Sequence, residues 1–381
     1  MVTGETSGEQ HAAGLIDEVN RQCPELKVEW FGSGGERMSE AGVNLLADVS
    51  RLAAIGPWDA LSLLSDYVKL YRRILKETRI RGTTVAILVD FPEFNLKLAR
   101  RLKKMGVFVC YFIGPQIWAW RSSRVRQISR WVDLMLVVLP FEQDFYERRQ
   151  VSARYVGNPS VSRLNRAQSR EAVPRREQTG QPFLVALFPG SRTQEVQRIL
   201  PVQLDAALHI SGHCPVRFWV AQAPGVSGQQ LLGIYDSWRH RTNSSLPLEI
   251  REEGSSSLLP QVDCAIIKSG TSTLEATLFQ IPFAMVYLMP WPIWFLLRPF
   301  VRTQSYCLAN LIAGKTIVPE FVQRHATGAN IGACIVQLLV DEKKRETMRE
   351  QLKEAADRLG RKDAYREAAK CLRECFLEKQ G

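Results

Sequence analysis

The chain has 381 residues, of which 45% are apolar and 23% charged, and this composition excludes disordered, fibrous and low-complexity proteins. At roughly 150 residues per domain, the length predicts two domains. Lysine and arginine total 50 against 39 aspartates and glutamates, so the net charge of +11 favours polyanionic partners, namely nucleic acid, anionic lipid or phosphorylated substrates. The eight cysteines form no Cys-x-x-Cys pair, which is typical of a reducing, cytoplasmic compartment.

The first half of the chain alternates helices with apolar strands. A glycine-rich loop and a helix open the chain, and only Met1 and Val2 precede them, so we expect the first strand of this half to be missing. Strands are predicted at 28–35, 84–90, 107–113, 133–139 and 153–159, and helices over 58–80 and around 96–102. This alternation predicts a parallel, doubly wound sheet.

The second half repeats the alternation after a polar stretch at 161–181. Its predicted strands lie within 183–192, 216–221, 248–252, 263–270 and 282–288. The tail from Asp341 is charged and helical, with a break near Gly360. The predicted fold class is therefore α/β, with Rossmann-like domains at 1–165 and 180–345 and C-terminal helices at 346–381 that pack back or are exchanged in a dimer.

A glycine turn follows the first strand of the second half. Gly190, Ser191 and Arg192 lie between this strand and a helix, where backbone N–H groups and a guanidinium suit a diphosphate. The alternative is a simple helix cap formed by Ser191 or Thr193.

A second turn of small residues, Ser269, Gly270 and Thr271, follows a later strand of the same half. Glu275 lies in the first turn of the next helix, where a carboxylate can bind a ribose diol. The alternative is a capped helix with Glu275 favourably placed on its dipole. Because the carboxyl ends of parallel strands meet at one crevice, the two turns together favour a nucleotide site.

Asp90 ends the apolar run 84–90, and Pro92 fixes the turn that follows. A carboxylate at this place can act as a general base. The alternative is an Asx-turn that closes the strand. Glu93 is a second carboxylate nearby, but we expect it to point elsewhere.

Three arginines, Arg121, Arg124 and Arg126, closely follow the tryptophans Trp118 and Trp120 at 114–128. Such a pattern favours nucleic acid in isolation. No nucleic-acid-binding motif accompanies it, and a sugar phosphate or a lipid headgroup suits the same residues.

A charge-free run at 281–297 contains three prolines, which argue against a membrane-spanning helix. Its aromatic end and the arginines after it suit a surface dipped into a lipid interface, and the alternative is a buried core segment. The residues predicted to face a membrane are Trp291, Trp294, Phe295, Arg298 and Arg302.

Seven short motifs together resemble the lipid-A-disaccharide synthase family, glycosyltransferases of the GT-B fold in which two Rossmann-like domains face a cleft. They are GETSG (4–8), DFPEFN (90–95), PQIWAWR (115–121), LPFE (139–142), FPGSR (188–192), SGTSTLE (269–275) and LANLIAG (308–314). The resemblance implies that Asp90 is the base for the acceptor hydroxyl. It implies that the UDP-binding residues are Gly190, Ser191, Arg192, Ser269, Gly270, Thr271, Glu275 and Asn310, and that the acceptor-binding residues are Glu5, Thr6, Ser7, Trp118 and Arg121.

The resemblance also implies the reaction. The family joins UDP-2,3-diacylglucosamine to 2,3-diacylglucosamine 1-phosphate, with inversion, and releases UDP during lipid A biosynthesis. We expect no cofactor, no metal and no nucleic acid. We expect peripheral contact with anionic lipid on the cytoplasmic face of the inner membrane of a Gram-negative bacterium, and a homodimer with exchanged C-terminal segments is implied.

The alternative from a different class is a non-catalytic basic protein that binds nucleic acid or lipid. It explains the net charge of +11 but neither glycine turn. The two hypotheses differ in their ligand, since only the enzyme is expected to bind UDP saturably, whereas binding to nucleic acid would fall steeply with salt.

Overall fold

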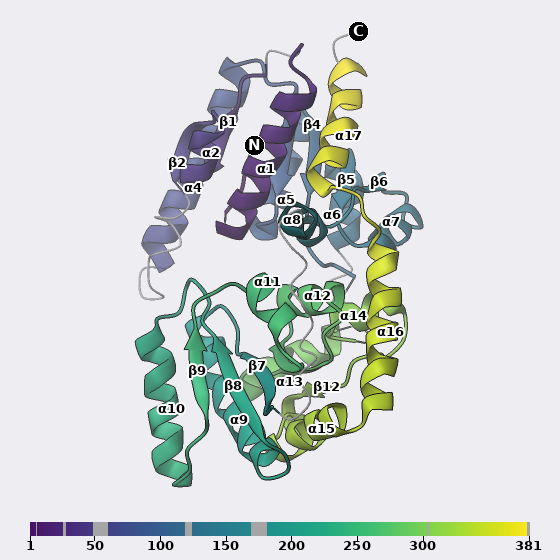
Figure 1. The fold of residues 1–381 in the computed structure, drawn as a ribbon. Helices are drawn as coiled ribbons and strands as arrows, with labels where there is room; N and C mark the ends of the chain where they lie inside the picture. The colour runs from purple at the N-terminus through teal and green to yellow at the C-terminus, as the bar shows by residue number, and fades with distance from the viewer. Residues whose placement is uncertain are drawn as a thin grey trace. The chain divides into compact units, whose positions relative to one another are not determined.

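The computed structural model describes residues 1–4, 6–25, 28–48, 60–118, 124–168, 181–301, 303 and 305–378. The chain divides into two compact units (Figure 1). Unit 1 comprises Met1–Arg163 and Arg361–Gly381, and unit 2 comprises Leu164–Gly360. The last helix of the chain therefore belongs to unit 1, whereas the helix before it belongs to unit 2.

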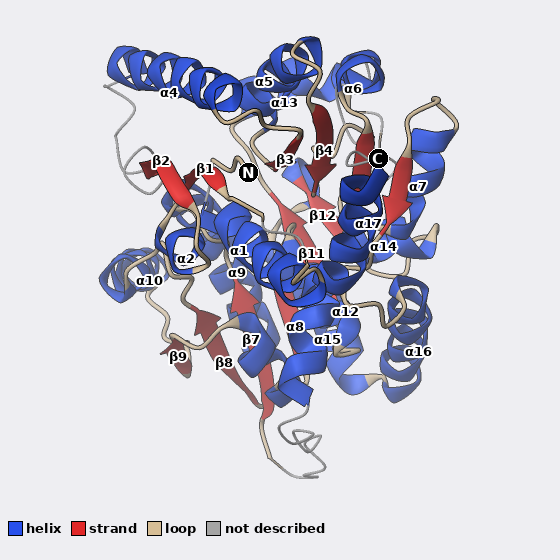
Figure 2. Ribbon diagram, turned by 90° about the horizontal axis from the view of Figure 1, so that it is seen from above, coloured by secondary structure: helices blue, strands red, loops and turns tan. Residues whose placement is uncertain are grey.

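Unit 1 alternates strands and helices in the way that the sequence predicts (Figure 2). Its elements are α1 (Thr6–Gln22), β1 (Phe31–Gly34), α2 (Glu36–Glu40), β2 (Asn44–Asp48), α4 (Ala60–Ile80), β3 (Val85–Val89), α5 (Pro92–Lys104), β4 (Phe108–Phe112), α6 (Val125–Trp131), β5 (Leu134–Val137), α7 (Pro140–Glu147), β6 (Ala153–Tyr155), α8 (Pro159–Gln168), which runs into unit 2, and α17 (Ala364–Glu378).

The strands of unit 1 are parallel, in the orders β1-β2 and β3-β4-β5-β6. Val2 lies between β1 and β3 and forms parallel bridges to Ser33 on one side and Leu88 on the other. Its N–H donates to Ile87 O at 2.9 Å, and its carbonyl accepts from Val89 N–H at 2.9 Å. Met1 and Val2 thus occupy the position of the expected first strand, although they form only isolated bridges there.

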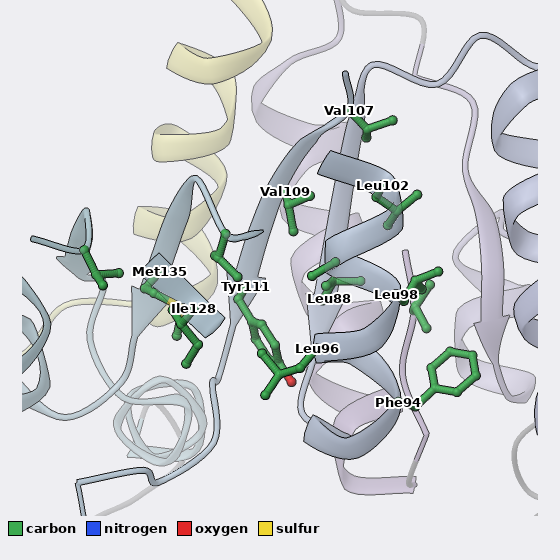
Figure 3. Packing of buried hydrophobic residues seen from close by; sticks show 14 of the residues in the cluster. Leu88, Phe94, Leu96, Leu98, Leu102, Val107, Val109, Tyr111, Ile128 and Met135 are labelled. Atoms are coloured by element: carbon green, nitrogen blue, oxygen red, sulfur yellow. The ribbon is translucent and has the colours of Figure 1, made fainter. Parts of the chain in front are cut away.

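Helices bury both faces of this sheet, which explains the continuous apolar runs of its strands. Ile87 and Val89 pack toward α1 and α17, whereas Leu88 packs on the opposite face with α4, α5 and α6. Figure 3 shows the second of these clusters, in which residues of α5 and α6 meet residues of β3, β4 and β5. Polar side chains that serve a site must therefore lie at the strand ends.

The C-terminal helix α17 packs along α1, as Figure 1 shows. The segment before α17 packs closely against Gly157, because a Cβ built at Gly157 would lie 2.6 Å from Lys362 O. Ala364 N–H then donates to Ser162 Oγ at 2.8 Å. His11 Nδ1 and Tyr365 OH, 2.9 Å apart, join the two helices.

Unit 2 contains the second sheet and the long helix α16. Its elements are β7 (Phe183–Phe188), α9 (Thr193–Ser211), β8 (Val216–Ala221), α10 (Gly228–Thr242), β9 (Leu248–Arg251), α11 (Ser255–Leu258), η3 (Leu259–Gln261), β10 (Cys264–Lys268), α12 (Thr271–Leu278), β11 (Phe283–Tyr287), α13 (Trp291–Leu297), η4 (Arg298–Phe300), α14 (Leu308–Ala313), β12 (Glu320–Val322), η5 (Gln323–His325), α15 (Gly328–Val340) and α16 (Glu342–Leu359).

The sheet of unit 2 is parallel, in the order β12-β11-β10-β7-β8-β9. The chain moves outward from β7 through β8 to β9 and then returns to place β10 on the other side of β7. The direction of winding therefore changes between β7 and β10, and such a switch point is where α/β proteins bind their ligands.

The predicted α/β class and the predicted strands of both halves are confirmed. Two strands were missed, β2 and β12. Both are edge strands, and β12 has only three residues, so neither has the long apolar run by which a buried strand is recognised.

We predict that His11 makes unit 1 sensitive to acid. Burial, with a smaller contribution from Arg163, lowers the pKa of His11 to about 4 from its ordinary value of 6.5. Between these two values the unfolded chain binds a proton that the folded chain does not, so the free energy of unfolding falls as pH falls, by about 2 kcal/mol at pH ~4.5. In urea titrations, His11→Gln should remove this loss.

The control is Tyr365→Phe, which removes the hydroxyl but keeps the ring that lies beside the half-buried His11. This variant should keep the dependence on pH between about 6.5 and 4. A His11→Gln variant with an unchanged pH dependence would contradict the assignment.

Candidate functional site

The two turns that the sequence singled out meet at the switch point of unit 2. Gly190 follows β7, Gly270 follows β10, and β7 and β10 are hydrogen-bonded neighbours. A cavity of about 140 Å³ lies between the turns. It is lined by Phe188, Pro189, Gly190, Ser191, Ala221, Gln222, Ala223, Glu253, Gly254, Ser255, Lys268, Gly270, Thr271 and Ser272.

Gly190 adopts a φ of +126°, a conformation that favours glycine. The N-cap of α9 is Arg192, not Ser191 or Thr193, so the alternative of a cap formed by one of those residues is wrong. Ser191 and Arg192 are exposed. The backbone N–H groups that begin α9 thus lie beside a guanidinium, which is an arrangement that attracts anions.

Lys268, which the sequence analysis did not select, joins the two turns. Its Nζ lies 3.0 Å from Glu195 Oε1, and its side chain is 20% exposed. A Cβ built at Gly270 would lie 3.9 Å from this Nζ, and one built at Gly190 would lie 2.7 Å from Glu195 Oε2. The one available signal was a lysine at the end of an otherwise apolar strand.

A second cavity, of about 480 Å³, adjoins Lys268 and Glu195. It is lined by Arg192, Thr193, Gln194, Glu195, Arg198, Lys268, Tyr287, Leu288 and Met289. Burial raises the pKa of Tyr287, and the charge of Glu195 raises it further. Lys268 is thus shared by two cavities, one at the glycine turns and one lined by basic residues of α9.

Glu275 is buried in α12, and Ser255 Oγ donates a hydrogen bond to Glu275 Oε2. Ser255 lines the cavity between the glycine turns, so the carboxylate of Glu275 lies next to this cavity. Ser269 Oγ donates to Tyr306 O at 2.7 Å, which fixes the turn after β10 to the loop before α14.

Asn310 is buried and uses its amide within unit 2. Its Oδ1 accepts from the N–H groups of Ile317 and Val318 at 2.8 Å, and its Nδ2 donates to Val318 O at 2.8 Å and to Glu320 Oε1 at 2.7 Å. Glu320 also accepts from the N–H groups of Tyr306 and Cys307. This network positions the loop to which Ser269 is bonded.

Asp90 lies at the corresponding place in unit 1, at the carboxyl end of β3. Asp90 and Phe91 have φ values of 49° and 51°, which are strained for residues other than glycine. Asn95 Nδ2 donates to Asp90 O at 2.7 Å, and Tyr111 OH donates to the same oxygen at 2.5 Å. Burial raises the pKa of Tyr111 well above its ordinary value, so Tyr111 remains a hydrogen-bond donor.

The opening loop of the chain reaches Asp90 and its neighbour. A Cβ built at Gly8 would lie 3.7 Å from Asp90 Cβ, and one at Gly4 would overlap the ring of Phe91 at 2.3 Å. The structure therefore brings the GETSG segment and Asp90 together. Glu5 lies outside the described residues, and Thr6 and Ser7 begin α1.

Trp118 is held by a buried carboxylate. Its Nε1 donates to Glu142 Oε1 at 2.9 Å, and Glu142 Oε2 accepts from the N–H groups of Val138 and Leu139. Burial raises the pKa of Glu142 to about 7, against the opposing effect of these donors. Arg121 lies outside the described residues.

The run predicted to face a membrane forms α13 and η4. Trp291, Ile293, Phe295, Leu296 and Phe300 are exposed there, so the alternative of a buried core segment is wrong for this end of the run. The earlier part of the run forms the buried strand β11. Arg298 is also exposed, and Arg302 lies outside the described residues.

Trp294 differs from its neighbours on α13 because it is half-buried, with its ring centroid 6.1 Å from that of Tyr306. No helix in the described part of the chain is both long and apolar enough to cross a bilayer.

Comparisons with known proteins cover nearly the whole chain. A family model described as lipid-A-disaccharide synthetase matches residues 1–376. The chain is 36% identical to the lipid-A-disaccharide synthase of Myxococcus xanthus over 379 residues, which are 98% of this chain and 96% of that protein. It is also 36% identical to the synthase of Nitrosococcus oceani over 362 residues, 94% of this chain and 92% of that protein.

Solved structures with low sequence identity share the fold. CalG4, the calicheamicin glycosyltransferase, has a TM-score of 0.59 at 14% identity, over 99% of this chain and 96% of its own. The UDP-GlcNAc 2-epimerase of Neisseria meningitidis has a TM-score of 0.60 at 11% identity, over 99% of this chain and 98% of its own. The predicted GT-B fold is confirmed by these similarities.

We predict that Asn310 acts by holding its loop rather than by direct contact with a nucleotide. Asn310→Ala leaves two buried N–H groups and a buried carbonyl without partners, so the free energy of unfolding should fall by roughly 2–4 kcal/mol in urea titrations. Asn330→Ala is the control, since Asn330 is exposed, and it should cost less than ~1 kcal/mol. A stable Asn310→Ala variant with weakened nucleotide binding would instead support direct contact.

Proposed function

Because the chain belongs to the lipid-A-disaccharide synthetase family, we propose that it joins UDP-2,3-diacylglucosamine to 2,3-diacylglucosamine 1-phosphate. The chain is a glycosyltransferase of lipid A biosynthesis, and the alternative of a non-catalytic binding protein is wrong. The proposal about these two substrates rests on the pair of turns at the switch point of unit 2, together with a carboxylate at the corresponding strand end of unit 1.

The turns after β7 and β10 bind the diphosphate of the sugar nucleotide. The N–H groups that begin α12 supply positive charge at the cavity between Gly190 and Gly270, and the guanidinium of Arg192, the N-cap of α9, supplies it at the adjoining cavity that shares Lys268. Such groups stabilise the negative charge that develops on the departing UDP. Glu275 binds the ribose in this proposal, and its hydrogen bond to Ser255, which lines the cavity, supports this role.

Asp90 is the general base for the acceptor. Its carboxylate takes the proton of the acceptor 6-hydroxyl while the hydroxyl oxygen forms a bond to the anomeric carbon and the bond from that carbon to UDP breaks. One displacement of this kind inverts the anomeric centre. The clamp of Asn95 and Tyr111 on the Asp90 carbonyl supports this role, because it fixes the base at a strained turn.

The acceptor site includes the GETSG segment and Trp118 in this proposal. The approach of Gly4 and Gly8 to Phe91 and Asp90 supports the first part. The hydrogen bond from Trp118 to Glu142 supports the second, because it gives the indole a fixed position. The proposed contacts of Glu5, Thr6, Ser7 and Arg121 rest on the family resemblance alone.

The exposed side chains of α13 and η4 contact the bilayer that holds the acylated substrates. Apolar side chains framed by a cation suit the boundary between headgroups and acyl chains. We therefore propose peripheral attachment to the cytoplasmic face of the inner membrane. A homodimer with exchanged C-terminal segments remains a prediction from the resemblance, and the segment expected to be exchanged, 346–381, includes α17 and most of α16.

The first test is release of UDP from the two acylated sugars. Asp90→Asn should lower turnover by roughly 10²–10⁴-fold, because it removes the general base. Its Kd for UDP, measured by calorimetry, should remain that of the unaltered protein. Glu93→Gln is the matched control, since Glu93 is an exposed carboxylate paired with Arg124, and it should keep near-normal turnover. An Asp90→Asn variant with normal turnover would leave Asp90 as a structural residue of its turn.

The second test concerns the membrane. Phe295 and Leu296 are 63% and 68% exposed, and burial of each in lipid contributes roughly 1.5–3 kcal/mol. Phe295→Ser with Leu296→Ser should therefore reduce sedimentation with anionic vesicles at least ~tenfold while the Kd for UDP is unchanged. Leu232→Ser on α10, where Leu232 is also exposed, is the control. Equal sedimentation of the double variant and the unaltered protein would rule out lipid contact through α13.

A further inference from the structure

Lys268 lies where the two glycine turns of unit 2 come together. It ends β10, whose neighbours are β7 and β11, and it lines both the cavity at the turns and the cavity beside Arg192. Its ammonium is close to Gly270, at 3.9 Å from a Cβ built there. No side chain at Gly270 separates the ammonium from the first cavity.

The partner of Lys268 is a carboxylate placed in a site that otherwise attracts anions. Glu195 Oε1 pairs with the ammonium at 3.0 Å, while Glu195 Oε2 is buried and accepts no hydrogen bond. Oε2 lies against Gly190, since a Cβ there would be 2.7 Å away. The position of Oε2 raises the free energy of the folded protein, because a buried acceptor without a donor loses its hydration and gains no hydrogen bond in return.

Resting on the proposed function, we infer that Lys268 is a second cation for the diphosphate of the sugar nucleotide and that it exchanges its ion pair with Glu195 for a phosphate oxygen when the nucleotide binds. The phosphate then takes the place of one carboxylate oxygen, at the turn where the N–H groups of α12 begin. Glu195 neutralises the ammonium while the site is empty, which avoids an unpaired charge at the end of a buried strand.

Arg192 and Lys268 divide the diphosphate between them in this arrangement. Arg192 is exposed before α9, whereas Lys268 is half-buried before α12. A diphosphate carries charge on both phosphates, and one cation from each strand end neutralises it from two directions. The lysine also stabilises UDP as a leaving group, because charge on UDP increases as its bond to the sugar breaks.

The experiment measures the Kd of the full chain for UDP and for uridine by calorimetry. Lys268→Met should weaken UDP binding by roughly 10- to 100-fold, the effect of losing one charge-assisted hydrogen bond. Binding of uridine, which has no phosphate, should not change. Lys268→Arg keeps the charge and should stay within a few-fold of the unaltered protein, and it serves as the second variant if Lys268→Met does not fold.

Glu195→Gln distinguishes a lysine that binds the diphosphate from a lysine whose ion pair with Glu195 is only structural. Both Lys268→Met and Glu195→Gln break the pair, but only the first removes the cation. Glu195→Gln should bind UDP at least as tightly as the unaltered protein, because the ammonium is released from its partner. If both variants weaken UDP binding equally, or if neither does, the exchange is overturned.

Two further measurements complete the design. Arg192→Ala should weaken UDP binding in the same range as Lys268→Met. Lys344→Met removes an exposed lysine on α16 and should leave the Kd unchanged, which controls for net charge. If the unaltered protein itself binds no UDP, the proposed function fails. If it binds UDP and Lys268→Met binds equally well, only the inference about Lys268 fails.

Discussion

The residues proposed for binding and catalysis lie at the carboxyl ends of parallel strands in both units, and in unit 1 helices cover both faces of the sheet. Successive residues of β3 pack in opposite directions, as Ile87 and Leu88 do, so no position along the strand is left for a polar group. A charged side chain of β3 can therefore emerge only where this strand stops. Asp90 in unit 1 and Lys268 in unit 2 are the first polar side chains after, or at the end of, such buried runs.

The two units make their sharp turns by different means, and the difference follows from what each turn must present. In unit 2 the turn presents backbone N–H groups, so Gly190 can adopt a φ of +126° without a side chain in the way. In unit 1 the proposed base needs a carboxylate, which glycine lacks. Asp90 and its neighbour then take left-handed conformations, which cost of order 1–3 kcal/mol each. The hydrogen bonds of Asn95 and Tyr111 to the Asp90 carbonyl offset this strain.

Features that depend on neighbours in sequence could be predicted, and features that depend on contacts across the fold could not. The apolar run before Gly190 and the residues after it predict, from adjacent residues alone, a strand end and a glycine turn, and the structure confirms both. Lys268 ends β10, whereas Glu195 follows β7, so the residues around neither one predict that the two side chains pair. The burial of Asn310 could not be predicted either, because it depends on hydrogen bonds to Ile317 and Val318, which lie beyond the next turn of the chain. The composition of the segment also could not predict that Trp294 is half-buried while the apolar residues around it are exposed.

Tyr306 connects the proposed lipid-facing helix with the proposed nucleotide turn. Its carbonyl accepts from Ser269, its N–H donates to Glu320, and its ring lies against Trp294 of α13. The loop is therefore fixed on one side by a turn that lines the cavity proposed for the diphosphate and on the other by a helix whose outer side chains are exposed. Loss of the Trp294 ring would disturb both ends of this connection at once. The proposed lipid contact is thus separable from the proposed nucleotide binding at the outer residues of α13, such as Trp291 and Phe295, whose rings contact each other.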